Sequence, residues 1–143
     1  MQQSRETIYS TLFALVSTSA SFNTISRRLK HWDDVDVDMQ PALYQTQRGE
    51  SIVQQKGLPA KTHLAATLYI YAHQDDEYSS PSEILNPLLD AVTSLFTPDP
   101  VTGTFTMGLS GVSHCWIEGK IETDEGLFGN QSFAVIPVSI LAY

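Results

Sequence analysis

The chain has 143 residues, 42% of them hydrophobic and 17% charged, which is the composition of one folded domain and not of a disordered chain. Sixteen acidic residues against eight basic ones give a formal net charge of -8, which argues against a groove that binds nucleic acid by neutralising phosphates. The single Cys115 excludes an internal disulfide framework, and no stretch approaches the ~20 consecutive apolar residues of a membrane span. We therefore expect a single domain over residues 1–143, made and used without export through a membrane.

The first third of the chain predicts one helix, two strands and a projecting segment. Residues 4–17 carry apolar side chains at helical spacing behind the capping residue Ser4, and so predict a helix. Residues 22–30 and 41–47 predict strands, the second with proline at its entry, where a missing donor is harmless. Residues 48–60 combine glycine and proline breakers with apolar side chains, which is typical of a projecting loop or arm.

The stretch 61–73, KTHLAATLYIYAH, alternates for longer than any helix tolerates and predicts the central strand. One face is apolar throughout and is a core face. The other face carries Tyr69 and Tyr71, whose large apolar bodies end in hydrogen-bonding tips. We expect this tyrosine face to be covered part of the time or by a polar partner.

A second helix is predicted over residues 82–96, where apolar side chains form the clearest helical stripe of the chain. Pro87 is tolerated only near a first helical turn. The regular helix is therefore expected to begin close to Asn86, after a looser turn.

The last third of the chain predicts three more strands. Residues 105–109 form a short one between glycines and prolines, and residues 113–123 alternate between inside and outside. Residues 132–141 are apolar on both faces, with Pro137 placing this strand at an edge or at a bulge. The expected order is α-β-β-β-α-β-β-β, an α+β fold of mainly antiparallel sheet with two helices on one face and projecting loops or arms.

Charged residues cluster in the sequence SRRLKHWDDVDVD. Its basic part contains Arg27, Arg28 and Lys30, and its acidic part runs from Asp33 to Asp38. Two interpretations stay open, because such neighbours form either an internal ion-pair network or two halves of a contact between subunits.

A glycine-bounded loop, DEGLFGN, is expected to join the last two strands as a hairpin. It presents Leu127 and Phe128 at its tip, where no core is available to hide them. Exposed apolar pairs of this kind usually mark a partner. The alternative is that the tip and the 48–60 arm fold back on their own subunit.

Catalytic and metal chemistry finds little support in the pattern. Alternate aspartates from Asp34 match the start of a calcium loop, but the required glycine and closing glutamate are missing. His114 and Cys115 point to opposite faces of a strand, and His63 and His73 lie ~33 Å apart on one strand. No phosphate-cradling loop, nucleophile elbow or HExxH sequence occurs. We expect neither an enzyme nor a cofactor.

Five segments, in this order and at these spacings, resemble the bacteriophage tail terminator-like family over nearly the whole chain. They are SRRLKHW, QPALYQTQRGE, LNPLLDAV, PDPVTG and HCWIEGKIETDEG. None of them is a chemical motif, and no residue role carries over position by position.

The resemblance implies a virion protein of the head-tail junction, assembled in the host cytoplasm. It implies a homo-oligomeric ring, usually of six subunits, that caps the growing tail tube and then meets the head-neck connector. Its partners would be further copies of itself, the tail tube protein and the connector protein. We expect DNA to pass through the lumen without specific binding, repelled by acidic side chains.

Two alternatives remain at this stage: another head-tail connector or tail completion protein, and a small metal-dependent enzyme. A closed ring needs two different patches on every subunit. The candidate interface residues are Arg27, Arg28, Lys30, Trp32, Asp33, Asp34, Ile52, Val53, Tyr69, Tyr71, Leu127 and Phe128.

Overall fold

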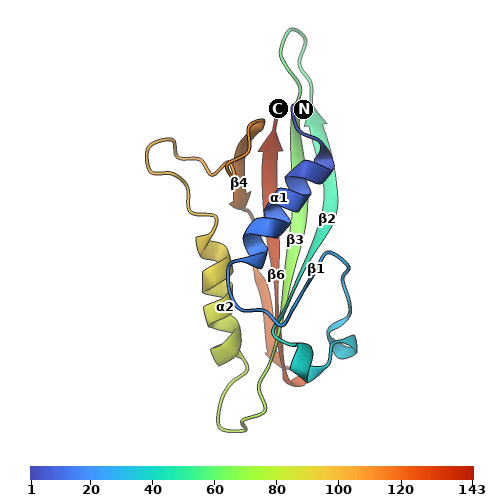
Figure 1. Cartoon of the computed structure of the whole chain (residues 1–143), viewed down its shortest axis with the longest axis vertical. Coiled ribbons are helices and arrows are strands. Elements are labelled where there is room, and N and C mark those ends of the chain that lie inside the picture. Colours follow the sequence, from blue (N-terminus) through green and yellow to red (C-terminus); the bar gives the residue numbers. More distant parts are fainter.

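The computed structural model describes all of residues 1–143. Its helices are α1 (Arg5–Ser17) and α2 (Ser82–Ser94), its strands are β1 (Thr24–Ser26), β2 (Ala42–Val53), β3 (Lys61–His73), β4 (Val112–Ile117), β5 (Glu122–Gly126) and β6 (Gly129–Ala142), and two short 3-10 helices lie at Trp32–Asp34 and Val37–Met39. Both α-helices cover the same face of one six-stranded, mostly antiparallel sheet (Figure 1). The chain is therefore an α+β protein, as expected.

The sheet has the order β1-β2-β3-β6-β4, with β5 paired to β6 on the same side as β4. Strand β3 pairs antiparallel with β2 on one side and with β6 on the other, so the long alternating stretch is the centre of the sheet. Strand β1 pairs parallel with β2 over three residues only. The hairpin of β2 and β3 projects beyond the rest of the molecule, at the end where both chain termini lie (Figure 1).

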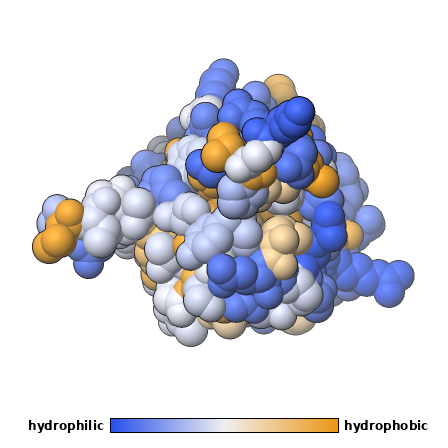
Figure 2. Space-filling view, turned by 90° about the horizontal axis from the view of Figure 1, so that it is seen from above, coloured by the Kyte–Doolittle hydropathy of each residue, from blue (hydrophilic) through white to orange (hydrophobic).

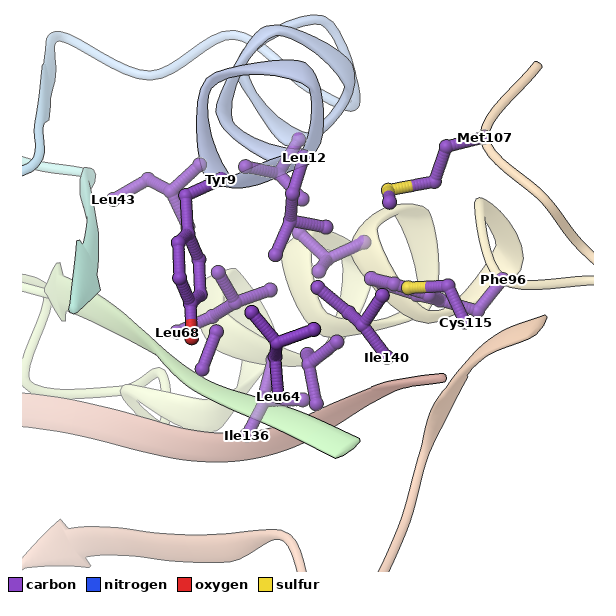
Figure 3. Packing of buried hydrophobic residues seen from close by; sticks show 14 of the residues in the cluster. Tyr9, Leu12, Leu43, Leu64, Leu68, Phe96, Met107, Cys115, Ile136 and Ile140 are labelled. Atoms are coloured by element: carbon purple, nitrogen blue, oxygen red, sulfur yellow. The ribbon is translucent and has the colours of Figure 1, made fainter. Parts of the chain in front are cut away.

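The main core fills the space between the helices and one sheet face, as Figure 3 shows. Helix α1 begins where the Ser4 side chain accepts a hydrogen bond from the Thr7 backbone N–H at 3.1 Å, and it lays Leu12 on the sheet. Leu64 and Leu68 of β3 are fully buried in the same core, on the sheet side of it. The Gln45 amide donates to the Tyr9 carbonyl at 2.9 Å and so ties α1 to β2.

The strand expected at 105–109 does not form. Met107 has a φ of 57°, followed by Gly108 at 66°, and these left-handed conformations turn the backbone instead of extending it. The segment still runs beside β4, because the Cys115 N–H donates to the Phe105 carbonyl at 2.7 Å. Phe105 packs edge-on against Phe96, so the alternating apolar residues reach the core from turns.

The strand expected at 113–123 is broken into β4 and β5 by residues 118–121. The break faces Pro137 of β6, whose carbonyl accepts from the Glu118 N–H at 3.3 Å. In an antiparallel strand the N–H and C=O of one residue point to the same side, so the donor that proline lacks would have pointed into this break. Of the two places expected for Pro137, an edge or a bulge, the edge is wrong, because β6 is paired on both sides. The irregularity at Pro137 is a break in the neighbouring chain, between β4 and β5.

Three further boundaries differ from expectation. The strand expected at 22–30 shrinks to β1, and the strand expected at 41–47 continues through the first half of the projecting segment as β2. The arm is therefore a paired hairpin with a loop at residues 54–60. Helix α2 begins at Ser82 and not near Asn86, so Pro87 lies inside it and removes one backbone hydrogen bond.

Candidate assembly surfaces

The tyrosine face of the sheet holds a second, smaller cluster of apolar side chains. Its buried members are Val35, Ala42, Tyr44 and Tyr71, and its half-buried neighbours are Trp32, Tyr69 and Phe133. The chain segment that holds the 3-10 helices crosses this end of the face and covers it. We call these seven residues the second-face cluster.

Tyr71 lies deeper than the sequence pattern indicated. Only 6% of it is exposed, and its hydroxyl donates to the Lys30 carbonyl at 2.7 Å. Burial raises the pKa of Tyr71 to about 12. Tyr71 is thus part of the subunit's own packing, whereas Tyr69 beside it is half-buried. The sequence predicted a partly covered face for both tyrosines. Tyr69 is partly covered, whereas Tyr71 is buried.

Farther along the same face, the sheet is open. A shallow depression of about 360 Å³ lies over small side chains such as Ala65 and Thr67, rimmed by Arg48, Lys120 and Glu122. At its far end Trp116 lies between two imidazoles, and its ring centroid is 5.6 Å from that of His63 and 4.9 Å from that of His114. His63 and His73, as expected, do not meet.

The basic cluster points in more than one direction. Arg27 reaches α1 and pairs with Glu6 at 2.5 Å, an ion pair inside the subunit. This pairing holds the pKa of the Glu6 carboxyl below its ordinary value. Arg28 and Lys30 are exposed and form no ion pair.

The acidic loop, residues 33–38, is not neutralised by the basic cluster beside it. None of its four carboxylates lies in an ion pair, and none accepts a hydrogen bond within the chain. Asp33 and Asp34 are exposed. Asp34 and Asp36 line a cavity of about 300 Å³ together with Lys30 and Tyr44. The internal ion-pair network is therefore not formed between these two segments.

The arm, residues 48–61, exposes apolar side chains on both sides of its hairpin. Ile52 is 59% exposed and Val53 is 56% exposed, and they point to opposite faces because they are successive residues of β2. Leu58 in the loop is 57% exposed. Figure 2, which looks along the long axis onto this end, shows hydrophobic residues exposed among hydrophilic ones.

The β5–β6 hairpin presents its tip as expected, but the two apolar residues there differ. Leu127 is 73% exposed and touches no core residue cluster. Phe128 folds back, with its ring centroid 4.9 Å from that of Trp32 and 6.0 Å from that of Phe133. Trp32, Tyr69, Tyr71 and Phe128, far apart in the sequence, thus meet at one end of the tyrosine face.

Four members of the second-face cluster were not predicted as site residues from the sequence, among them the aromatic residues Tyr44 and Phe133. The signal for these two is their strand parity, because Tyr44 pairs with Tyr69 and Phe133 pairs with Tyr71 across β3. That signal becomes readable only once the strand register is known.

The side chains that could take part in catalysis or metal binding are scattered over the molecule. Cys115 is fully buried, and burial raises the pKa of its thiol to about 12. No group of three or more His, Cys, Asp or Glu side chains is arranged to hold a metal ion. His73 contacts the exposed Asp75 at 2.7 Å. Neither helix has the length and apolar character that a membrane crossing requires.

No protein-family model matches this chain, and no curated protein sequence matches it.

Proposed function

We propose that this chain is the subunit of a tail terminator-like ring in a long-tailed bacteriophage. The ring would end polymerisation of the tail tube and join the tail to the head-neck complex, with DNA passing through its lumen. The five segments quoted above support the family, and the α+β sheet backed by two helices agrees with the subunit that the family implies.

The observation that carries the proposal is the pair of exposed apolar surfaces at opposite ends of the subunit. Ile52 and Val53 lie on the arm, and Leu127 lies at the tip of the β5–β6 hairpin. A closed ring is built from heterologous contacts, in which different surfaces of each copy meet. One copy of this chain offers both.

The distribution of charge supports passage of DNA without binding. Carboxylates gather at the end of the sheet away from the arm, in the acidic loop, in the loop after β3, and around the start of α2 and the end of β5. They are Asp33, Asp34, Asp36, Asp38, Asp75, Asp76, Glu77, Glu83, Asp124 and Glu125. Such a surface repels phosphates wherever it borders a channel. A channel lined mainly by Lys and Arg would contradict this part of the proposal.

The test is deletion of the gene for this chain from the phage genome, followed by electron microscopy of the particles. Unattached tails of abnormal length are expected, and complementation with the wild-type chain should restore joined tails of uniform length. Labelling of the complementing protein should mark the head-tail junction, at the tail side. Normal, joined tails in the deletion, or label elsewhere in the particle, would contradict the proposal.

A pair of variants makes the same test specific to the arm. Ile52→Glu places a charge on the exposed hairpin and should fail to complement, although the subunit stays folded, because the side chain lies outside both clusters. Val101→Glu is the matched control, since Val101 is 91% exposed in a different loop. Equal complementation by both variants would remove the arm from the assembly.

A further inference from the structure

The arm and the acidic loop carry opposite charges that find no partner inside the subunit. Between residues 51 and 61 the arm contains Lys56 and Lys61 and no carboxylate. The acidic loop contains four aspartates and no basic residue. Glu50, at the base of the arm, pairs with Arg5 of α1, and the other two ion pairs of the chain use Glu6 and Asp75, so Lys56, Lys61 and the four aspartates lie in none of them. Both surfaces therefore offer free charge to a second molecule.

The cavity beside the acidic loop lacks hydrogen-bond partners for two of its own groups. Thr24 and Tyr44 are among the residues that line this cavity, and their hydroxyl oxygens are buried without a hydrogen-bond partner. Tyr44 is only 1% exposed. Buried polar groups in folded proteins are nearly always hydrogen-bonded, so two unpartnered hydroxyls on residues that line one cavity of about 300 Å³ point to a further polar group that would satisfy them.

A lysine ammonium has the chemistry that this cavity lacks. It carries three donors and no acceptor, so it can bind a carboxylate and a hydroxyl lone pair at the same time. Asp34 and Asp36 supply the carboxylates, and Tyr44 supplies the hydroxyl. Lys30 also lines the cavity and opposes a second cation, but the two carboxylates outnumber it and Asp33 stands beside them.

We propose that the arm of one copy docks on the acidic loop of a second copy, with the ammonium of Lys56 entering the cavity beside Asp34 and Tyr44. This inference deepens the proposed ring and rests on it for the meaning of the contact.

The contact must join two copies, because the two surfaces lie at opposite ends of the long axis (Figure 1). Strand β2 runs from Ala42, beside the acidic loop, to Val53 on the arm, and at a rise of about 3.3 Å per residue it spans more than ~30 Å. Exposed apolar side chains accompany the charges on both surfaces. Val53 and Leu58 lie on the arm, and Met39, 45% exposed, lines the cavity.

Docking of this kind is head-to-tail, so each bound copy still presents a free arm at one end and a free acidic loop at the other. Repeated contacts of this kind form a closed ring if the rotation between copies closes, and an open filament if it does not. The two surfaces of one kind of subunit are then sufficient for assembly.

The experiment measures self-association of the purified full chain by sedimentation velocity over a range of concentrations. Lys56→Glu and Asp34→Lys should each raise the dissociation constant of self-association by about tenfold or more. In the double variant the dissociation constant should return to within about threefold of wild type. Lys120→Glu is the matched control, since Lys120 is equally basic but rims the open sheet face. High salt should weaken wild type and the double variant alike.

Three results would overturn the inference: a wild-type chain that stays monomeric at every concentration, single variants that associate as wild type does, or a double variant that does not recover. Failure of the function is distinguishable, because it is read from tails in the gene deletion. Unattached tails of abnormal length in the deletion, together with normal joined tails in Lys56→Glu, would exclude this contact and leave the proposed ring standing.

A second variant tests the cavity without changing charge. Tyr44→Phe keeps the ring and deletes the unpartnered hydroxyl. Association should weaken about threefold to tenfold, while urea unfolding shows a monomer no less stable than wild type. Unchanged association in this variant would exclude the hydroxyl from the contact.

Discussion

The same chemical change at two neighbouring tyrosines should destabilise the chain at one of them and not at the other. Tyr44 and Tyr71 belong to one cluster, with ring centroids 5.5 Å apart, and both are nearly inaccessible. The Tyr71 hydroxyl donates to the Lys30 carbonyl at 2.7 Å, whereas the Tyr44 hydroxyl is buried without a partner. Replacement by phenylalanine keeps each ring in place, so the difference between the two variants isolates the hydroxyls.

The magnitudes follow from the hydrogen bonds. Tyr71→Phe loses one bond to a backbone carbonyl and should lower the free energy of unfolding by about 1 kcal/mol, a fall in Tm of about 3 °C for a chain of this size. Tyr44→Phe removes a desolvated group that gains nothing in the monomer, and should leave the free energy unchanged or raise it by about 1 kcal/mol. Tyr69→Phe, at a half-buried position, should change little.

Urea unfolding followed by tryptophan fluorescence suits this comparison, because Trp32 is itself a member of the second-face cluster. The protein concentration should be low enough to keep the chain monomeric. Losses of equal size in Tyr44→Phe and Tyr71→Phe would refute the reasoning, since they would show that the two hydroxyls have equivalent surroundings.

The remaining predictions concern pH, thiol chemistry and packing. Burial raises the pKa of Tyr71 from 10.0 to about 12, so the unfolded chain loses this proton first and stability should fall between pH 10 and about 12, less steeply in Tyr71→Phe, as alkaline urea titrations would show. The buried Cys115 thiol should not react with an aromatic disulfide reagent until urea unfolds the chain, and rapid reaction in native buffer would contradict its burial. Leu68→Ala should cost about 3 kcal/mol in urea unfolding, whereas Ile52→Ala on the exposed arm should cost almost nothing; equal losses would show that the arm packs on its own subunit.

The centre of the fold could be predicted from the sequence because its signals are long. Residues 61–73 alternate over the whole of β3, and residues 4–17 combine a cap with a helical stripe. The three alternating apolar residues at 105–109 were too few to distinguish a strand from turns that aim side chains at the same core. The positive φ of Met107 decides between them, and no residue type announces it, since methionine rarely adopts this conformation.

The candidate surfaces, too, were only partly predictable from the sequence. The exposed residues Ile52 and Leu127 were predictable because glycines and prolines bound their segments and leave no room for cover. The burial of Tyr71 was not, since the cover comes from Trp32 and Val35, more than thirty positions away in the chain. Local alternation says which face a side chain occupies, and only tertiary structure says what lies on that face.

Pro137 has a consequence for how the edge of the sheet finds its register. Strand β6 has no donor at that position, and the chain opposite leaves its ladder there, at residues 118–121. If β4 and β5 slid by two residues, the faces of their side chains would be preserved, but a paired residue would stand opposite the proline with its carbonyl unsatisfied. The proline thereby penalises the misregistered pairings that hydrophobic alternation alone would accept. It therefore favours a single register of β4 and β5 on β6.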